Sequence, residues 1–160
     1  MVIYIGADHR GFELKEYLKN FLKNKGFEVV DVGNDHLDEN DDYPDFAEKV
    51  AVKVNQDYEN ARGVLICGSS VGVDVVANKF MKVRSALVAN PDQAFDSRND
   101  DDANVLALAA NYLALEDAQK ILTVWLSTPF SGDPHHLRRI QKIVQLEFKI
   151  SKPISEEEQN

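Results

Sequence analysis

The chain has 160 residues, of which 44% are hydrophobic and 28% charged, and its formal net charge is -9 at pH 7. This size and composition indicate one globular domain with room for a sizeable core. The apolar runs are shorter than the about 20 residues of a membrane span, and the acidic balance argues against a nucleic-acid binder. A single cysteine excludes an internal disulfide, and the N-terminus lacks a signal pattern, so we expect a cytoplasmic protein.

The first half of the chain alternates strand-like and helix-like segments. Residues 2–6 form a short apolar run rich in β-branched residues, and apolar residues then recur at helical spacing over 12–26. Residues 27–33 predict a second strand, and an acidic loop over 35–45 leads into a helix over 45–56. The acidic loop lacks EF-hand spacing, so we expect a solvated loop rather than a cation site.

The second half continues this alternation. The continuously apolar segment 63–68 is typical of a parallel strand covered on both faces, and a helix over 71–80 opens from the turn after it. Further segments complete the order: strands 83–89 and 103–110, helices 114–126 and 134–148, and a disordered tail over 149–160.

Strand–helix alternation predicts an α/β fold with a five-stranded parallel sheet and helices on both of its faces. Right-handed crossovers bring the carboxyl ends of the strands to one edge, where ligands bind. Polar clusters follow four strands: at Asp8 and His9, in the turn 67–72, at 90–92 and near Asn111. We therefore expect the functional site at that edge.

The turn "CGSSVG" holds the only cysteine of the chain. Gly68 and Gly72 allow several backbone N–H groups to converge, and the next helix adds its positive end, so the turn suits a phosphate, a carboxylate or a developing oxyanion. A thiol at Cys67 beside a helix start is expected to have a lowered pKa and to react near neutral pH. The alternatives are a turn that serves packing alone and a buried, inert cysteine.

Two other clusters could carry chemistry. Asp8 can take a proton from a sugar hydroxyl, with His9 beside it; a helix cap and a surface histidine are the alternatives. In "PHHLRRIQKI", His135 and Arg139 share a helix face and suggest a phosphate site, although a solvated face explains them almost as well. One cysteine and four scattered histidines form no zinc pattern.

Six motifs occur in order over residues 2–145: "GADHRGFELKEYL", "DDYPDFA", "GVLICGSSVGVDVVANKF", "RSALV", "ANVLALAA" and "RRIQKI". Together they resemble the ribose-5-phosphate isomerase type B and galactose-6-phosphate isomerase family. The resemblance implies an αβα three-layer, Rossmann-like isomerase domain over 1–148 that isomerises a phosphorylated sugar without a metal or other cofactor. It also implies a homodimer or a dimer of dimers, in which the last helix packs on the partner and subunits share active sites.

The resemblance assigns roles to individual residues. Cys67 would be the base that moves a proton between C1 and C2 through a cis-enediolate, which the backbone amides from Gly68 to Gly72 would stabilise. Asp8 resembles the residue that assists ring opening, and Ser69 the one that bonds a substrate hydroxyl. The other residues expected to contact the substrate are His9 and Arg139, at the phosphate, and Tyr43, Gly68, Ser70, Val71, Gly72, Asp101 and His135.

Four positions depart from the family pattern. Ser70 replaces a glycine in the turn, which costs about 1–2 kcal/mol if that position requires a positive φ. Asp100 stands where the family has a catalytic histidine; it could still accept a proton during ring opening, but it repels an anionic substrate. Asn111 and His135 stand at the positions of phosphate-binding arginines.

The residues leave three interpretations open. The first is an isomerase of ribose 5-phosphate or a related hexose 6-phosphate, with Arg98, Lys79 or Arg138 as candidates to replace the lost cations. The second is an isomerase-like enzyme for a less charged sugar. The third is a non-catalytic sugar-phosphate binding module. Ready alkylation of Cys67 at pH 7, slowed by a sugar phosphate, is expected of the two enzymes.

Overall fold

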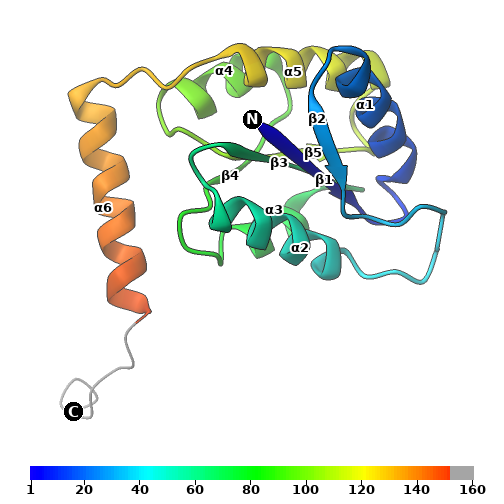
Figure 1. Cartoon of the computed structure of the whole chain (residues 1–160), viewed down its shortest axis with the longest axis horizontal. Helices are drawn as coiled ribbons and strands as arrows, with labels where there is room; N and C mark the ends of the chain where they lie inside the picture. Colours follow the sequence, from blue (N-terminus) through cyan, green and yellow to red (C-terminus); the bar gives the residue numbers. More distant parts are fainter. Residues whose placement is uncertain (152–160) are drawn as a thin grey trace, which may run out of the picture.

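The computed structural model describes residues 1–151, and a five-stranded sheet forms its centre (Figure 1). The strands are β1 (Val2–Ala7), β2 (Glu28–Asp31), β3 (Ala61–Cys67), β4 (Ser85–Leu87) and β5 (Val105–Ala109). They lie in the order β2-β1-β3-β5-β4, and each neighbouring pair is parallel. The predicted α/β fold class with a five-stranded parallel sheet is confirmed.

Helices cover both faces of the sheet, which makes the three layers visible in Figure 1. One face is covered by α1 (Phe12–Asn24), α4 (Pro91–Asn99) and α5 (Leu115–Ser127). The other face is covered by α2 (Tyr43–Gln56) and α3 (Val71–Ala77). The last helix, α6 (Pro134–Ile150), stands apart from these layers at one end of the molecule (Figure 1).

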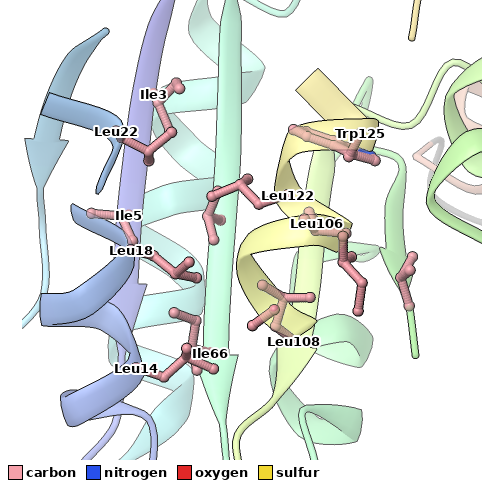
Figure 2. Close-up of a cluster of buried hydrophobic side chains, with 14 of the residues drawn as sticks. Ile3, Ile5, Leu14, Leu18, Leu22, Ile66, Leu106, Leu108, Leu122 and Trp125 are labelled. Carbon is pink, nitrogen blue, oxygen red and sulfur yellow. The ribbon is translucent and has the colours of Figure 1, made fainter. Parts of the chain in front are cut away.

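The central strands are apolar throughout because helices bury both of their faces. Every residue of β5 is buried, and so is nearly every residue of β3. Leu14, Leu18 and Leu22 recur every four residues, so they form one stripe of α1 that faces the sheet. Figure 2 shows the resulting cluster between α1, α5 and the sheet: Ile3, Ile5, Leu14, Leu18, Leu22, Ile66, Leu106, Leu108, Leu122 and Trp125.

The apolar periodicity did not predict α4, which fills the connection between β4 and β5. This helix has no apolar stripe, and only Ala94 and Arg98 are buried in it. Its start is set by local chemistry instead. The Asn90 side chain accepts a hydrogen bond from the N–H of Gln93 at 2.9 Å, and Pro91 supplies the fixed φ of a first helical residue.

Some boundaries also differ from the predicted ones. Helix α3 ends at Ala77, because the side chain of the next residue, Asn78, bonds the backbone N–H and C=O of Ser85 at 2.9 and 3.0 Å. Helix α6 runs to Ile150, beyond its predicted end at 148. Most of the predicted tail, residues 152–160, lies outside the described residues. Within residues 1–151, no helix is both long enough and apolar enough to cross a membrane.

Candidate active site

A cavity of about 730 Å³ opens at the carboxyl ends of the central strands, the edge where the sequence places the site. Loops after β1, β3 and β5, the start of α2 and one side of α3 form its walls. Most residues expected at the site line it: Asp8, His9, Tyr43, Cys67, Gly68, Ser69, Val71 and Gly72. Its lining is completed by Arg10, Asp41, Asp42, Val75, Val76 and Asn111.

Cys67 is the last residue of β3 and lies in the cavity wall with 6% of its surface exposed. Burial is the largest effect on its thiol and raises the pKa; the N–H of Ser70 lowers the pKa by less, and the charge of Asp8 raises it again. The expected lowering of the Cys67 pKa is therefore wrong for the chain on its own. Helix α3 has only seven residues, and its start does not offset the loss of water around the sulfur.

Ser70, which stands where the family has a glycine, has a left-handed backbone conformation with φ at 57°. Its side chain compensates for this strained backbone. The hydroxyl is fully buried, accepts a hydrogen bond from the N–H of Cys67 at 2.9 Å and donates to the carbonyl of Leu108. Ser70 therefore lies behind the turn and shapes it, and it does not itself line the cavity. Its predicted direct contact with substrate is not supported by this geometry.

The two glycines of the turn are needed because neighbouring side chains approach the backbone closely. A Cβ at Gly72 would lie 2.5 Å from the ring of Tyr43. A Cβ at Gly68 would lie 2.8 Å from the Arg10 side chain and 2.9 Å from that of Asn111. The glycines thus let Tyr43, Arg10 and Asn111 close around the turn that holds the thiol.

Asp8 stabilises the turn before α1 and lines the cavity, but it does not cap α1, whose N-cap is Gly11 without a side-chain hydrogen bond. Oδ1 of Asp8 accepts hydrogen bonds from the N–H groups of Arg10 and Gly11, both at 3.0 Å, and so stabilises the turn that leads into α1. The same carboxyl lines the cavity, and burial, the largest effect on it, raises its pKa. A raised pKa makes this carboxylate a stronger proton acceptor toward a hydroxyl in the cavity.

His9 is held by an acidic residue from the loop before α2. Oδ1 of Asp41 accepts hydrogen bonds from the backbone N–H of His9 at 2.9 Å and from its Nδ1 at 2.8 Å. This hydrogen bond is the largest effect on the imidazole and raises its pKa. A histidine that stays protonated to higher pH suits an anionic group in the cavity.

Four residues expected at the site lie away from this cavity: Asp100, Asp101, His135 and Arg139. Asp100 follows α4, and its Oδ1 lies 3.6 Å from Nδ1 of His136 in α6. Asp101 lines a separate groove beneath α6. His135 and Arg139 belong to α6, and both side chains are exposed. One chain by itself does not bring these four residues to Cys67.

The proposed substitute cations are also outside the cavity, which neither Lys79 nor Arg138 lines. Arg98 is buried and serves the fold: its guanidinium donates to Oδ1 of Asp102 and to the carbonyl of Ala103, both at 2.7 Å. Its hydrogen bonds are therefore used inside the chain that carries it.

The family model described as ribose/galactose isomerase matches residues 3–143 of the chain. The chain belongs to this family. The probable ribose-5-phosphate isomerase B of Mycoplasma genitalium is 43% identical over 145 residues, which cover 91% of this chain and 95% of the relative. The D-erythrulose-4-phosphate isomerase of Pectobacterium atrosepticum is 36% identical over 130 residues, which cover 81% of this chain and 85% of that one.

The fold agrees with this assignment to the ribose/galactose isomerase family. A crystal structure of ribose-5-phosphate isomerase B from Mycoplasma genitalium, with bound ribulose-5-phosphate, matches with a TM-score of 0.90 and 43% identity. The match covers 92% of this chain and 96% of that one. As a ribose/galactose isomerase, the chain is an enzyme, an intramolecular oxidoreductase that acts on sugar phosphates.

Sequence reasoning missed two charged residues that line this cavity, Arg10 and Asp41. Arg10 directly follows His9 in the loop after β1, so its position was a usable signal. Asp41 was indistinguishable from its acidic neighbours, and the expectation of a solvated loop is wrong for it. Its carboxyl is only 7% exposed, because His9 and the loop around it exclude water.

Proposed function

We propose that this enzyme interconverts ribose 5-phosphate and ribulose 5-phosphate through a cis-enediolate, with Cys67 as the base. The observation that carries the proposal is the convergence of a thiol, a carboxylate and a glycine-spaced turn on one cavity, at Cys67, Asp8 and residues 67–72. The names of the Mycoplasma genitalium relatives, one of them with ribulose-5-phosphate bound, support this substrate.

The proton moves between two neighbouring carbons. The Cys67 thiolate takes the proton from C2 of the open-chain aldose, and the electron pair passes to the C1 oxygen to form the enediolate. The resulting thiol returns the proton to C1, while the hydroxyl proton on O2 passes to O1, so that C2 becomes the carbonyl of the ketose and O1 its hydroxyl. Fixed backbone N–H groups lower this barrier because they bind the oxygen charge that develops only in the transition state.

The buried position of Cys67 suits a base for a carbon acid. A thiol with a raised pKa gives a strongly basic thiolate, although less of it is ionised at neutral pH. Asp8 would accept the anomeric hydroxyl proton when the furanose ring opens, and the exposed hydroxyl of Ser69 would bond a sugar hydroxyl. Tyr43 would cover the sugar from the start of α2.

The charges that line the cavity do not by themselves suit a phosphate dianion. His9 and Arg10 face three carboxylates there, those of Asp8, Asp41 and Asp42. We therefore infer that a second subunit supplies further cations, Arg139 above all, with His135 and Asp101 as the other expected contacts. The partner's Asp100 would assist ring opening. The neighbouring His136 of the partner subunit would take the place of the histidine that the family has at position 100.

The surface of α6 supports such a homodimer. Only Ile140 is buried in this helix of seventeen residues, whereas five of its large apolar side chains are between 39% and 80% exposed. These exposed side chains are Leu137, Ile143, Leu146, Phe148 and Ile150. Apolar side chains exposed to this extent on one helix are typical of a subunit interface, and a second copy of the chain would cover them.

Proton NMR of ribose 5-phosphate in D₂O tests the reaction directly, with wild type and a Cys67→Ala control. We expect ribulose 5-phosphate with deuterium at C1 from wild type and no product from the variant. Product formation that survives in Cys67→Ala would contradict the cysteine base. A wild type that neither isomerises ribose 5-phosphate nor exchanges its C2 proton would contradict the proposed substrate.

The shared site is tested by mixing two inactive variants, Cys67→Ala and Arg139→Ala, after joint refolding. In a mixed dimer one site combines an intact Cys67 with an intact Arg139, so random pairing restores about a quarter of wild-type activity. A mixture as inactive as its components would exclude sites built from two subunits.

Another sugar phosphate is the second candidate substrate. Asp100, Asn111 and His135 stand at cationic positions of the family pattern, and the Pectobacterium relative is named for a four-carbon substrate. Erythrulose 4-phosphate and galactose 6-phosphate therefore belong in the same NMR assay. A higher kcat/KM with either of them would replace ribose 5-phosphate in the proposal.

A further inference from the structure

The loop before α2 carries a side chain whose position its acidic neighbours do not explain. Asp41 lies among Asp38, Glu39 and Asp42, yet its carboxyl is 7% exposed, and it turns toward the loop after β1. One of its oxygens, Oδ1, accepts two hydrogen bonds from a single residue, His9. A surface carboxylate that only solvates a loop has no such geometry.

The other oxygen of Asp41 is also fixed. Oδ2 accepts a hydrogen bond from Nδ2 of Asn34 at 3.1 Å, and the Asn34 carbonyl accepts one from Nζ of Lys15 at 2.9 Å. Lys15 is fully buried and also bonds the carboxylate of Asp31 at the end of β2. A continuous chain of hydrogen bonds thus joins Asp41 to the sheet, which sets the carboxylate before any substrate arrives.

We propose that Asp41 is the positioning residue that holds the His9 imidazole with a proton on Nδ1 and presents Nε2–H to the phosphate of the substrate. An ionised carboxylate only accepts hydrogen bonds, so the ring nitrogen 2.8 Å from Oδ1 carries a proton. Nε2 has no hydrogen-bond partner among residues 1–151, and His9 lines the cavity. This assignment rests on the proposed function, in which His9 contacts phosphate.

The charge of Asp41 decides whether Nε2 can donate. In a neutral imidazole with its proton on Nδ1, Nε2 is an acceptor and repels a phosphate oxygen, whereas the cation donates from both nitrogens. The hydrogen bond to Asp41 is the largest effect and raises the His9 pKa, and the charges of Asp8 and Asp41 act in the same direction. Burial and the charge of Arg10 oppose this rise. The other titratable groups of the cavity are Asp42, Tyr43 and Cys67.

The same loop provides a matched control. His36 pairs with Asp35 in the same atomic arrangement, with Nδ1 2.6 Å from Oδ1. Both of these side chains are exposed, and neither residue lines the cavity. The Asp35 pair raises the His36 pKa as the Asp41 pair raises that of His9. Asp35→Asn therefore removes one carboxylate from this loop without touching His9.

The experiment measures two quantities in wild type, Asp41→Asn, Asp41→Glu and Asp35→Asn. The first is the titration and tautomer of His9, from long-range proton–nitrogen NMR spectra assigned by the signal lost in His9→Asn. The second is KM and kcat for ribose 5-phosphate at pH 6 and pH 8. The NMR quantity needs no substrate, so it decides the positioning of His9 even if ribose 5-phosphate is not isomerised.

We expect wild-type His9 to carry its proton on Nδ1 when neutral, and Asp41→Asn to lower its pKa. KM then rises about tenfold at pH 8 and less at pH 6, with kcat nearly unchanged, because one charge-assisted bond to phosphate is lost. Asp41→Glu restores part of the affinity, and Asp35→Asn lowers only the pKa of His36. A neutral His9 protonated on Nε2, or a His9 pKa unchanged in Asp41→Asn, would overturn the proposal. A loss in kcat alone would overturn it too.

Discussion

Replacing Ser70 separates two effects that oppose each other in the turn beside the thiol. The left-handed backbone at φ 57° costs a residue with a side chain about 1–2 kcal/mol. The hydroxyl offsets this cost through its buried hydrogen bonds to the Cys67 N–H and the Leu108 carbonyl, whose loss costs about 1–3 kcal/mol. Ser70→Ala keeps the strain and loses the hydrogen bonds, so we expect a loss of about 2 kcal/mol in the free energy of unfolding.

Ser70→Gly loses the same hydrogen bonds but relieves the strain. Relief of the strain stabilises the glycine variant, but the greater freedom of glycine in the unfolded chain cancels about 0.4–1 kcal/mol of that stabilisation. We therefore expect the glycine variant to be about 1 kcal/mol more stable than the alanine variant. Urea unfolding at one fixed protein concentration measures all three proteins. An alanine variant as stable as the glycine variant would refute the strain, and one as stable as wild type would refute the role of the hydroxyl.

Two further predictions concern the same cavity. In Gly72→Ala the new Cβ would lie 2.5 Å from the Tyr43 ring, and this exposed ring can move aside. We therefore expect kcat/KM to fall at least about tenfold, while the free energy of unfolding changes by less than about 1 kcal/mol. Steady-state kinetics and urea unfolding measure the two quantities, and full activity would mean that the observed position of Tyr43 is not needed for the reaction. Because burial raises the pKa of Cys67, its thiolate is scarce at pH 7, so the ready alkylation that the sequence suggested is no longer expected of an enzyme. We expect iodoacetamide inactivation to be slow at pH 7 and to rise about tenfold per pH unit without a plateau below about pH 9. A plateau near pH 7, measured by mass spectrometry of alkylated Cys67, would show a lowered pKa instead.

The strand–helix order was readable from the sequence wherever burial imposes a pattern. The apolar run 63–68 and the stripe of Leu14, Leu18 and Leu22 are consequences of packing against the sheet, and both lie where they were predicted. Helix α4 carries no such stripe, since it lies at the margin of the core and is set by its Asn90 cap. Periodicity therefore could not find it.

The sequence by itself determined the family and most of the residues that meet at the cavity, because ordered motifs such as "CGSSVG" preserve a backbone shape. Only the tertiary structure decided the direction in which the pKa of each group shifts. The Cys67 pKa moves upward rather than downward, since desolvation depends on what packs around the sulfur. His9 is paired with Asp41, thirty-two residues away along the chain, through a contact that no local pattern encodes. Distances of this kind exist only once the loops after β1 and β2 have been brought to the same edge of the sheet.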